Sequence, residues 1–191
     1  DDEPTPKKER LVFEDHFERA DLGSQWLDTG GNYKIVEGQL RAKGARNKPL
    51  WLKRKLPRDA KVSFTARSES PAIDIKAELW GDGKSKAKAL SYNATSYVVI
   101  LGGWNNSRSI IARMDEHGDD RKVRKKPKGV VGKRYEFVIS RKQTKLTWVL
   151  DGKKFLMLDD PKPLEGQGHE YFAFNNWETE VYFDDLKVYE I

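Results

Sequence analysis

The chain has 191 residues and no cysteine. This absence excludes disulfide bonds, thiolate metal sites and cysteine nucleophiles together. Long apolar runs are missing too, because the longest, such as YVVIL at residues 97–101, fall far short of the roughly 20 residues that a membrane-spanning helix requires. The sequence begins with Asp1 and not with methionine, which we interpret as a processed or trimmed chain; removal of a signal peptide is one explanation.

Motifs that mark common catalytic and nucleic-acid-binding sites are also absent. The sequence has no G-x-S-x-G elbow, no glycine-rich phosphate loop and no H-E-x-x-H zinc motif. Helix-turn-helix, zinc-finger and RNA-recognition patterns are missing, so no nucleic-acid partner is expected. The three histidines, His16, His117 and His169, do not have the spacing of metal ligands.

Hydrophobic residues are scarce, at 37% of the chain, below the usual range for globular domains. Six tryptophans, seven tyrosines and eight phenylalanines offset the shortage, because each fills a large volume. The first ten residues, DDEPTPKKER, lack an apolar anchor, and we expect a flexible tail at residues 1–10. A single domain is expected at residues 11–191.

The net charge is +6, and much of the excess is local. The basic segment RKVRKKPK, which begins at Arg121 and ends at Lys128, places six basic side chains in eight residues. Such runs usually repel one another and stay in solvent. The alternative is a docking patch for a polyanion, such as an acidic polysaccharide.

Alternation of apolar and polar residues dominates the chain and predicts β-strands. Turn residues such as Gly102-Gly103 and Asp151-Gly152 separate the alternating segments. Because none of the segments shows a sustained helical period, we predict an all-β fold, a two-sheet antiparallel sandwich. The clearest strands are expected at residues 61–67, 72–80, 97–101, 134–140 and 180–191, with a hairpin at residues 145–158.

Three segments resemble concanavalin A-like lectin and glucanase jelly rolls. In the opening, LVFEDHFERADLGSQW, an F-x-D-x-F stretch leads to L-G-x-x-W. The segments SYVVILGGWNNSRSIIARMDEHG and YFAFNNWETEVYFDDLKVYEI look like bacterial members linked to polysaccharide utilisation. The resemblance covers most of residues 11–191 and implies a secreted, periplasmic or cell-surface bacterial protein. It implies no single activity, because this fold hosts lectins, hydrolases, lyases and adhesion modules. The opening match is carried by Phe13, Asp15, Phe17, Leu22, Gly23 and Trp26.

The catalytic motif of the glucanases with this fold is absent. Those enzymes carry two catalytic glutamates in an E-x-D-x-E or E-x-D-x-x-E strand. The nearest stretch here is AIDIKAE, in which Ala72 replaces the first glutamate and only Asp74 matches. Asp74 and Glu78 share one face of the expected strand with Lys76 between them, and we expect this face to be solvated and charged.

Tryptophan and asparagine occur together at residues 104–106 and again at residues 175–177. An indole face can stack on a sugar ring, and short amides exchange hydrogen bonds with hydroxyl groups. By alternation, Trp51 and Trp80 also fall on polar strand faces. We therefore predict a glycan-binding cleft; the alternative is that the asparagines cap turns and the tryptophans seal the sandwich ends. The predicted ligand-binding residues are Trp80, Trp104, Asn105, Asn106, Arg113, Asn175, Asn176 and Trp177.

Three functions remain in competition. The favoured one is a non-catalytic carbohydrate-binding, lectin-like domain that prefers an acidic polysaccharide. The second is a polysaccharide hydrolase or lyase, with Arg113, Glu116 and His117 as the catalytic candidates. The third is an adhesion or scaffold module that binds protein through the basic segment. No cofactor is expected beyond a candidate structural Ca²⁺ at Asp184 and Asp185, because jelly rolls often hold a cation near their terminal strands.

Overall fold

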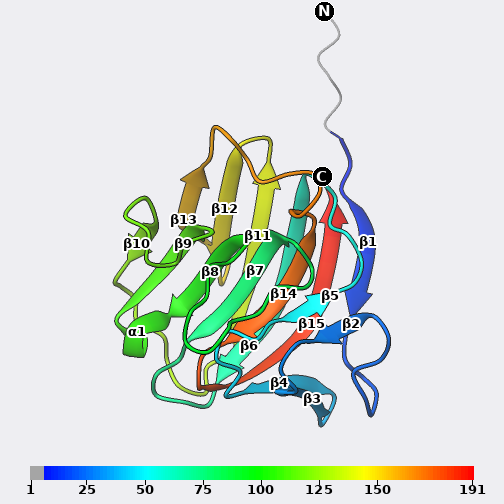
Figure 1. The fold of residues 1–191 in the computed structure, drawn as a ribbon, viewed down its shortest axis with the longest axis vertical. Coiled ribbons are helices and arrows are strands. Elements are labelled where there is room, and N and C mark those ends of the chain that lie inside the picture. Colours follow the sequence, from blue (N-terminus) through cyan, green and yellow to red (C-terminus); the bar gives the residue numbers. More distant parts are fainter. Residues whose placement is uncertain (1–6) are drawn as a thin grey trace, which may run out of the picture.

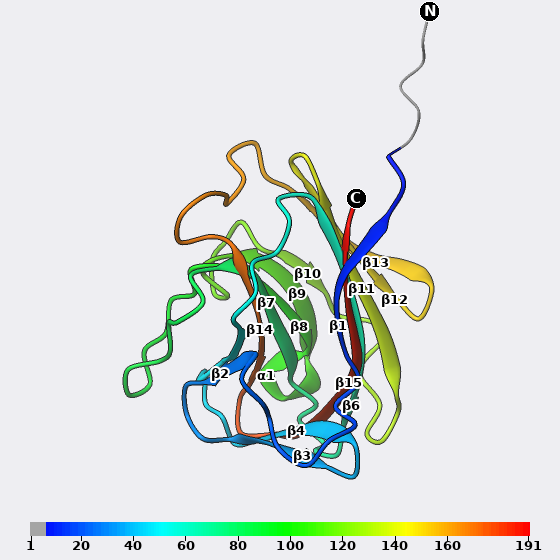
Figure 2. The same ribbon diagram turned by 90° about the vertical axis from the view of Figure 1, so that its right-hand side faces the viewer.

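Two antiparallel β-sheets pack face to face, as the sequence predicts (Figures 1 and 2). The structure is a computed structural model, and it describes residues 7–191. The eight-stranded sheet has the order β13-β12-β11-β6-β15-β4-β3, and β1 pairs with β15. Its strands are β1 (Arg10–Asp15), β3 (Tyr33–Val36), β4 (Gln39–Lys43), β6 (Ala60–Ser68), β11 (Tyr135–Lys142), β12 (Lys145–Leu150), β13 (Lys153–Asp159) and β15 (Glu180–Glu190).

The seven-stranded sheet has the order β10-β9-β8-β7-β14-β5-β2. A short turn, α1 (Gly103–Asn106), connects β8 to β9. Among residues 7–191, no helix is long and apolar enough to cross a membrane. The strands of this sheet are β2 (Trp26–Asp28), β5 (Leu50–Leu52), β7 (Ile75–Gly81), β8 (Tyr97–Gly102), β9 (Arg108–Arg113), β10 (Lys122–Arg124) and β14 (Tyr171–Asn176).

The strands predicted from alternation are confirmed, with small shifts at their ends. The hairpin predicted at residues 145–158 is formed by β12 and β13, with Asp151 and Gly152 at its turn. Strand β8 is central, between β7 and β9. One of its faces packs into the core, and Tyr92, Ala94 and Trp104 pack against the other, so its residues are buried on both faces. The tail expected at residues 1–10 lies mostly outside the described residues, and Arg10 already belongs to β1.

Aromatic side chains fill much of the space between the two sheets. The ring of Phe64, on the eight-stranded sheet, lies 4.8 Å from that of Phe137 and 5.2 Å from that of Phe174, which comes from the opposite sheet. Phe174 in turn lies 4.3 Å from Phe183. Such pairs add to the stabilisation from burial, so a chain with few hydrophobic residues still builds a closed core.

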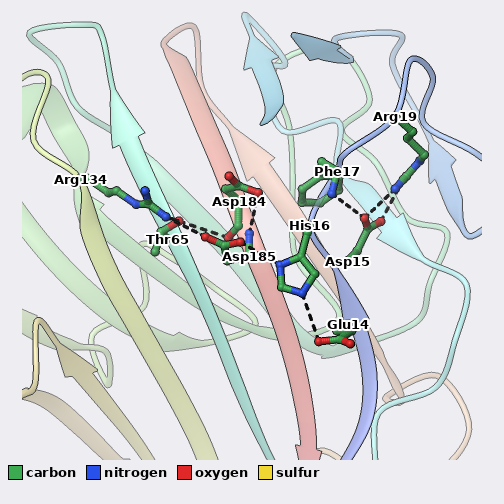
Figure 3. A network of polar contacts seen from close by, with 9 residues as sticks. All are labelled: Glu14, Asp15, His16, Phe17, Arg19, Thr65, Arg134, Asp184 and Asp185. Atoms are coloured by element: carbon green, nitrogen blue, oxygen red, sulfur yellow. Dashed lines mark hydrogen bonds and ion pairs between the residues drawn. The ribbon is translucent and has the colours of Figure 1, made fainter. Parts of the chain in front are cut away.

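The opening motif of the chain is held together by a buried carboxylate (Figure 3). Asp15 accepts a hydrogen bond from the backbone N–H of Phe17 at 2.9 Å, one from Nε1 of Trp26 at 2.9 Å, and two from Arg19 at 2.6 and 2.9 Å. Burial alone would raise the pKa of Asp15, but the bonds from Arg19, Trp26 and Phe17 outweigh it and lower the pKa. The hydrogen bonds of Asp15 therefore hold the first strand and the loop that follows it against the core.

Replacing Asp15 by Ala is expected to cost about 3 kcal/mol of unfolding free energy, because it leaves the guanidinium of Arg19 and two buried N–H donors without their acceptor. Asp21→Ala, on the exposed loop that follows, is the matched control. The contribution of Asp15 should be present near neutral pH and disappear as the pH falls through the lowered pKa of its folded state. Urea denaturation at pH 7 measures the effect, and equal midpoints for the two variants would contradict it.

Candidate functional site

A cavity of about 620 Å³ lies on the outer face of the seven-stranded sheet. Lys76 of β7 and Ile100 of β8 pair across the ladder and line its base, and loop 82–96 covers the adjoining part of this face (Figure 2). The volume is within the range of small-molecule pockets. Its other lining residues are Asn47, Ser70, Pro71, Ala72, Asp74, Leu90, Gly103, Trp104, Asn105, Glu116, His117, Trp177, Glu178 and Thr179.

A buried lysine occupies the base of the cavity. Lys76 is only 2% exposed, and its Nζ lies 2.6 Å from Oε2 of Glu116 and 2.5 Å from Oδ1 of Asn47. A buried ammonium group is tolerated only with such partners, because leaving water is costly for a charge. The positive charge of Lys76 is thus matched within the protein.

Asp74 is the carboxylate of the cavity that forms no ion pair within 4.0 Å among residues 7–191. Its Oδ1 is buried and has no hydrogen-bond partner among residues 7–191. Burial raises the pKa of Asp74 to about 7; Lys76 opposes this shift and Glu116 adds to it. Near neutral pH the cavity therefore carries a carboxyl group that is poised between its neutral and charged forms.

A second buried carboxylate fastens loop 82–96 to the sheet. Glu78 is fully buried and accepts hydrogen bonds from Tyr92 Oη at 2.7 Å, Ser96 Oγ at 2.6 Å and Asn175 Nδ2 at 2.8 Å. Burial raises the pKa of Glu78, although these bonds oppose the shift. Leu90, at the turn in the middle of this loop, is 76% exposed and contributes to the cavity lining.

A left-handed turn presents Trp104 and Asn105 to the cavity. Trp104, Asn105 and Asn106 have φ values of 49°, 55° and 57°, a conformation that costs energy for residues with side chains. The turn is held by Asn106, whose side chain donates to the carbonyl of Gly129 and accepts from its N–H, both at 2.9 Å. Backbone strain that surrounding contacts maintain often marks a functional site.

Aromatic and basic side chains meet at the rim of the cavity. The guanidinium carbons of Arg121 and Arg108 lie 5.0 and 5.8 Å from the ring centre of Trp104. His117 meets the same ring edge-on at 5.5 Å. Trp177 also lines the cavity. Two indole rings therefore border the cavity, and two arginine side chains lie against one of them. We call these arginines, Arg108 and Arg121, the basic rim.

The structure brings five of the predicted site residues together. Trp104, Asn105 and Trp177, predicted as ligand-binding residues, line the same cavity as the catalytic candidates Glu116 and His117.

Trp80 does not belong to this cavity, and the prediction that it lies on a polar face is wrong. It is 1% exposed in the core and donates from Nε1 to the carbonyl of Pro57 at 3.1 Å. Its φ of 59° breaks the strand alternation and turns the ring inward. Trp51 does lie on the outer face, opposite Ala173, but it is completely covered and packs where Gly81 leaves room for its ring.

Four further predicted residues are engaged within the protein instead of lining the cavity. Asn106 holds the turn at residues 103–106, and Asn175 lies beneath the cavity against Glu78. Asn176, which is completely buried, donates to Thr179 Oγ1 at 2.8 Å. Arg113 forms an ion pair with Asp160 at 2.8 Å. For the asparagines, the alternative interpretation as structural residues describes their contacts better.

The candidate calcium residues Asp184 and Asp185 lie at a bulge of β15 (Figure 3). Asp185 already binds two basic groups, His16 Nδ1 at 2.8 Å and Arg134 at 2.7 Å. Hydrogen bonds to Asp185 and then Glu14 raise the pKa of His16. Residues 7–191 contain no cluster of three or more His, Asp or Glu side chains suited to a metal ion. A cation at this bulge would have to displace Arg134 and His16.

The charged base of the cavity was missed by the sequence analysis. Lys76 and Glu78 were expected on a solvated face, but both are buried. Lys76 lies against Asn47 and Glu116, and Glu78 lies against Tyr92 and Ser96 of loop 82–96. Asn47 likewise reaches the cavity from a loop that is distant in sequence from β7. The available signal was the alternation of Asp74, Lys76 and Glu78 itself, which correctly places three charged side chains in one row.

Solved structures with low sequence identity share this fold. The carbohydrate binding module CBM66 from Bacillus subtilis superposes with a TM-score of 0.67 at 12% identity, covering 87% of this chain and 96% of its own. The Emp47p carbohydrate recognition domain gives 0.66 at 12%, with 94% and 96% covered. An endo-β-1,3-glucanase from Pyrococcus furiosus gives 0.63 at 13%, with 95% and 94% covered. The fold is therefore a concanavalin A-like jelly roll.

Comparison with curated protein sequences gives no match. A family profile described as Farnesoic acid 0-methyl transferase matches residues 83–185, more than half of the chain. The matched part runs from loop 82–96 through β14 into β15 and includes Trp104, Glu116 and Trp177 of the cavity. The chain therefore belongs to the Farnesoic acid 0-methyl transferase family.

Proposed function

We propose that this protein is a carbohydrate-binding, lectin-like domain whose glycan enters the cavity on the outer face of the seven-stranded sheet. The observation that carries the proposal is the pairing of two indole rings, Trp104 and Trp177, with polar groups in one cavity of about 620 Å³. Flat aromatic faces suit sugar rings, and the nearby amides and carboxylates of Asn47, Asn105 and Asp74 suit hydroxyl groups. Structural neighbours named as carbohydrate-binding domains support the proposal.

An acidic polysaccharide is the ligand class that the surroundings of the cavity favour. Arg113 is one of the predicted ligand-binding residues, but its guanidinium forms an ion pair with Asp160. Arg108 and Arg121 take that role in our proposal, because neither has a carboxylate within 4.0 Å among residues 7–191. The basic segment continues from Arg121 toward Lys128 and extends the positive surface. A secreted, periplasmic or cell-surface location would give such a domain access to its glycan.

Polysaccharide cleavage is the second candidate, because Glu116 and His117 line the cavity together with Asp74. Release of reducing ends, or new absorbance from unsaturated products, would establish it. Binding of protein through the basic segment is the third candidate; it predicts a salt-sensitive pull-down that survives loss of Trp104.

The family description names a methyl transfer, which implies a nucleoside-containing methyl donor. Such cofactors are commonly held where a parallel strand leads through a glycine-rich turn into a helix. Both sheets here are antiparallel, and the helical segment α1, over the described residues, is a four-residue left-handed turn. The residues therefore do not fit such a donor, and the proposed function involves no methyl transfer.

Replacing Trp104 by Ala is expected to weaken glycan binding about tenfold or more, because it removes an aromatic face and the support of Arg108 and Arg121. Tyr182→Ala, an aromatic truncation on the other sheet, is the matched control. A glycan array identifies the polysaccharide that the native protein retains best, and affinity electrophoresis then compares the variants. Equal retardation of the Trp104 variant and the native protein would contradict the assigned cavity, and an array without any bound glycan would contradict the function.

A further inference from the structure

Charge is distributed unequally between the cavity and its rim. Inside, the acidic lining residues Asp74, Glu116 and Glu178 outnumber the single lining lysine, Lys76. Glu116 is matched by Lys76 at 2.6 Å, and Glu178 is matched by Arg46 at 2.6 Å. Asp74 has one buried oxygen that finds no hydrogen-bond partner in the described part of the chain. Over residues 7–191, the interior therefore offers hydrogen-bonding groups but no lysine or arginine left without an ion pair for a carboxylate of the ligand.

Immediately outside, the charge has the opposite sign. Arg108 and Arg121 lie against the ring of Trp104, which itself lines the cavity. Arg121 donates to the carbonyl of Glu116 at 2.6 Å. This acceptor is neutral, so it holds the guanidinium in place without offsetting its positive charge. One indole ring thus separates an acidic interior from a basic rim.

We infer that the cavity and the basic rim are two subsites of opposite charge preference, the cavity holding an uncharged sugar residue while the acidic group of a neighbouring residue binds Arg108 and Arg121. This inference rests on the proposed glycan binding and narrows its ligand to a polysaccharide in which uncharged and acidic residues are mixed. A chain made only of uronates would place a carboxylate next to Asp74, and like charges in contact are strongly unfavourable. A wholly neutral chain would leave the basic rim unused.

Three oligosaccharides of equal length separate these possibilities: hyaluronan, in which uronate alternates with an uncharged amino sugar derivative, oligogalacturonate, which contains only uronate, and a neutral cello-oligosaccharide. Titration calorimetry at pH 8 should rank hyaluronan first, with oligogalacturonate about tenfold or more weaker. The three probes also differ in their glycosidic linkages. The test of the inference is therefore the change in affinity for each probe between the native protein and a variant, because the linkage is the same in both measurements.

Asp74→Asn should raise the affinity for oligogalacturonate several-fold relative to hyaluronan, because it removes the unmatched charge of the cavity. The double variant Arg108→Gln, Arg121→Gln should reduce hyaluronan binding to the level of the neutral probe and abolish its salt dependence. Lys142→Gln with Lys145→Gln, two exposed lysines at the β11–β12 turn, is the control and should change nothing.

The pH supplies a second readout. Lys76, Glu116, His117 and Glu178 are the other titratable residues that line the cavity with Asp74. Asp74, whose pKa burial raises to about 7, is mostly neutral at pH 5.5, while uronates remain charged. The preference of the native protein for hyaluronan over oligogalacturonate should therefore shrink between pH 8 and pH 5.5, and the Asp74→Asn variant should show no such change.

Two results would overturn the two-subsite inference while leaving glycan binding intact. One is tight binding of the neutral probe that is unchanged in the arginine double variant. The other is an unaltered ratio of hyaluronan to oligogalacturonate affinity in Asp74→Asn. Failure of the native protein to bind these probes, or any glycan on an array, would instead contradict the proposed function itself.

Discussion

At pH 8 the Asp74→Asn variant is expected to be more stable than the native protein, by as much as about 4 kcal/mol of unfolding free energy. The folded protein holds Asp74 with a pKa of about 7, whereas the group's ordinary value is 3.8, and each unit of difference corresponds to about 1.4 kcal/mol. Burial is the main cause, and Lys76 offsets only part of it. Ionising Asp74 therefore works against folding.

The sign of the pH dependence follows from this raised pKa. The stabilising contribution of a neutral Asp74 is fully present below about pH 4 and is lost as the pH rises through about 7. Asn cannot ionise, so the stability difference between the variant and the native protein should be near zero at pH 4, grow through pH 7 and level off above it. The residue also has a φ of 47°, a conformation that Asn tolerates.

Urea denaturation from pH 4 to pH 9 measures this difference, since all other titrating groups are shared by the two proteins. Asp159→Asn, an exposed carboxylate at the end of β13, provides the control and should show a flat difference. A flat curve for Asp74→Asn would mean that its carboxylate is solvated, and the acidic character assigned to the cavity would then be wrong.

Arg141→Ala is expected to lower the unfolding free energy by about 4 kcal/mol. Arg141 is completely buried, and it donates to the carbonyl of Arg58 at 2.8 and 3.0 Å and to that of Leu164. Its guanidinium carbon lies 4.0 Å above the ring of Trp80. Truncation would leave two carbonyl groups without donors and a void beside the indole ring.

Arg141→Lys tests the geometry separately from the charge. An ammonium group cannot reproduce the planar fork that reaches both carbonyls while stacking on Trp80. Most of the loss should therefore persist, and for a protein of this size the Ala variant should melt roughly 8–16 °C lower. Calorimetry provides the comparison, and Arg58→Ala, at a partly exposed neighbour, is the control. A Lys variant as stable as the native protein would show that charge alone matters.

Much of the fold could be predicted from alternation, because a half-buried strand imposes a period of two on its residues. Strands such as β6 and β11 follow the expected pattern, with buried residues at every second position. The pattern failed at Trp80, where a left-handed residue interrupts the period at the end of β7. Nothing in the local sequence distinguishes an indole that stays on its face from one that turns inward.

The candidate site was harder to predict because its residues meet through loops. Trp104 and Trp177 were identified by their chemistry, and both line the cavity. The burial of Lys76 and Glu78, in contrast, depends on loops: Asn47 and Glu116 lie against Lys76, and Tyr92 and Ser96 of loop 82–96 lie against Glu78. Periodicity assigns a residue to one face of a strand, but only tertiary structure decides whether a loop later covers that face.

The pairing of the first strand with the last has a mechanical consequence. β1 runs antiparallel to β15, with Arg10 opposite Glu190, so both ends of the described chain leave the sandwich at the same corner (Figure 1). Tension applied between these ends would load the hydrogen bonds of this pair one after another, as in opening a zipper, and not all at once as in shear. The outermost strand should therefore peel away at low force, long before the sheet that bears the cavity is strained.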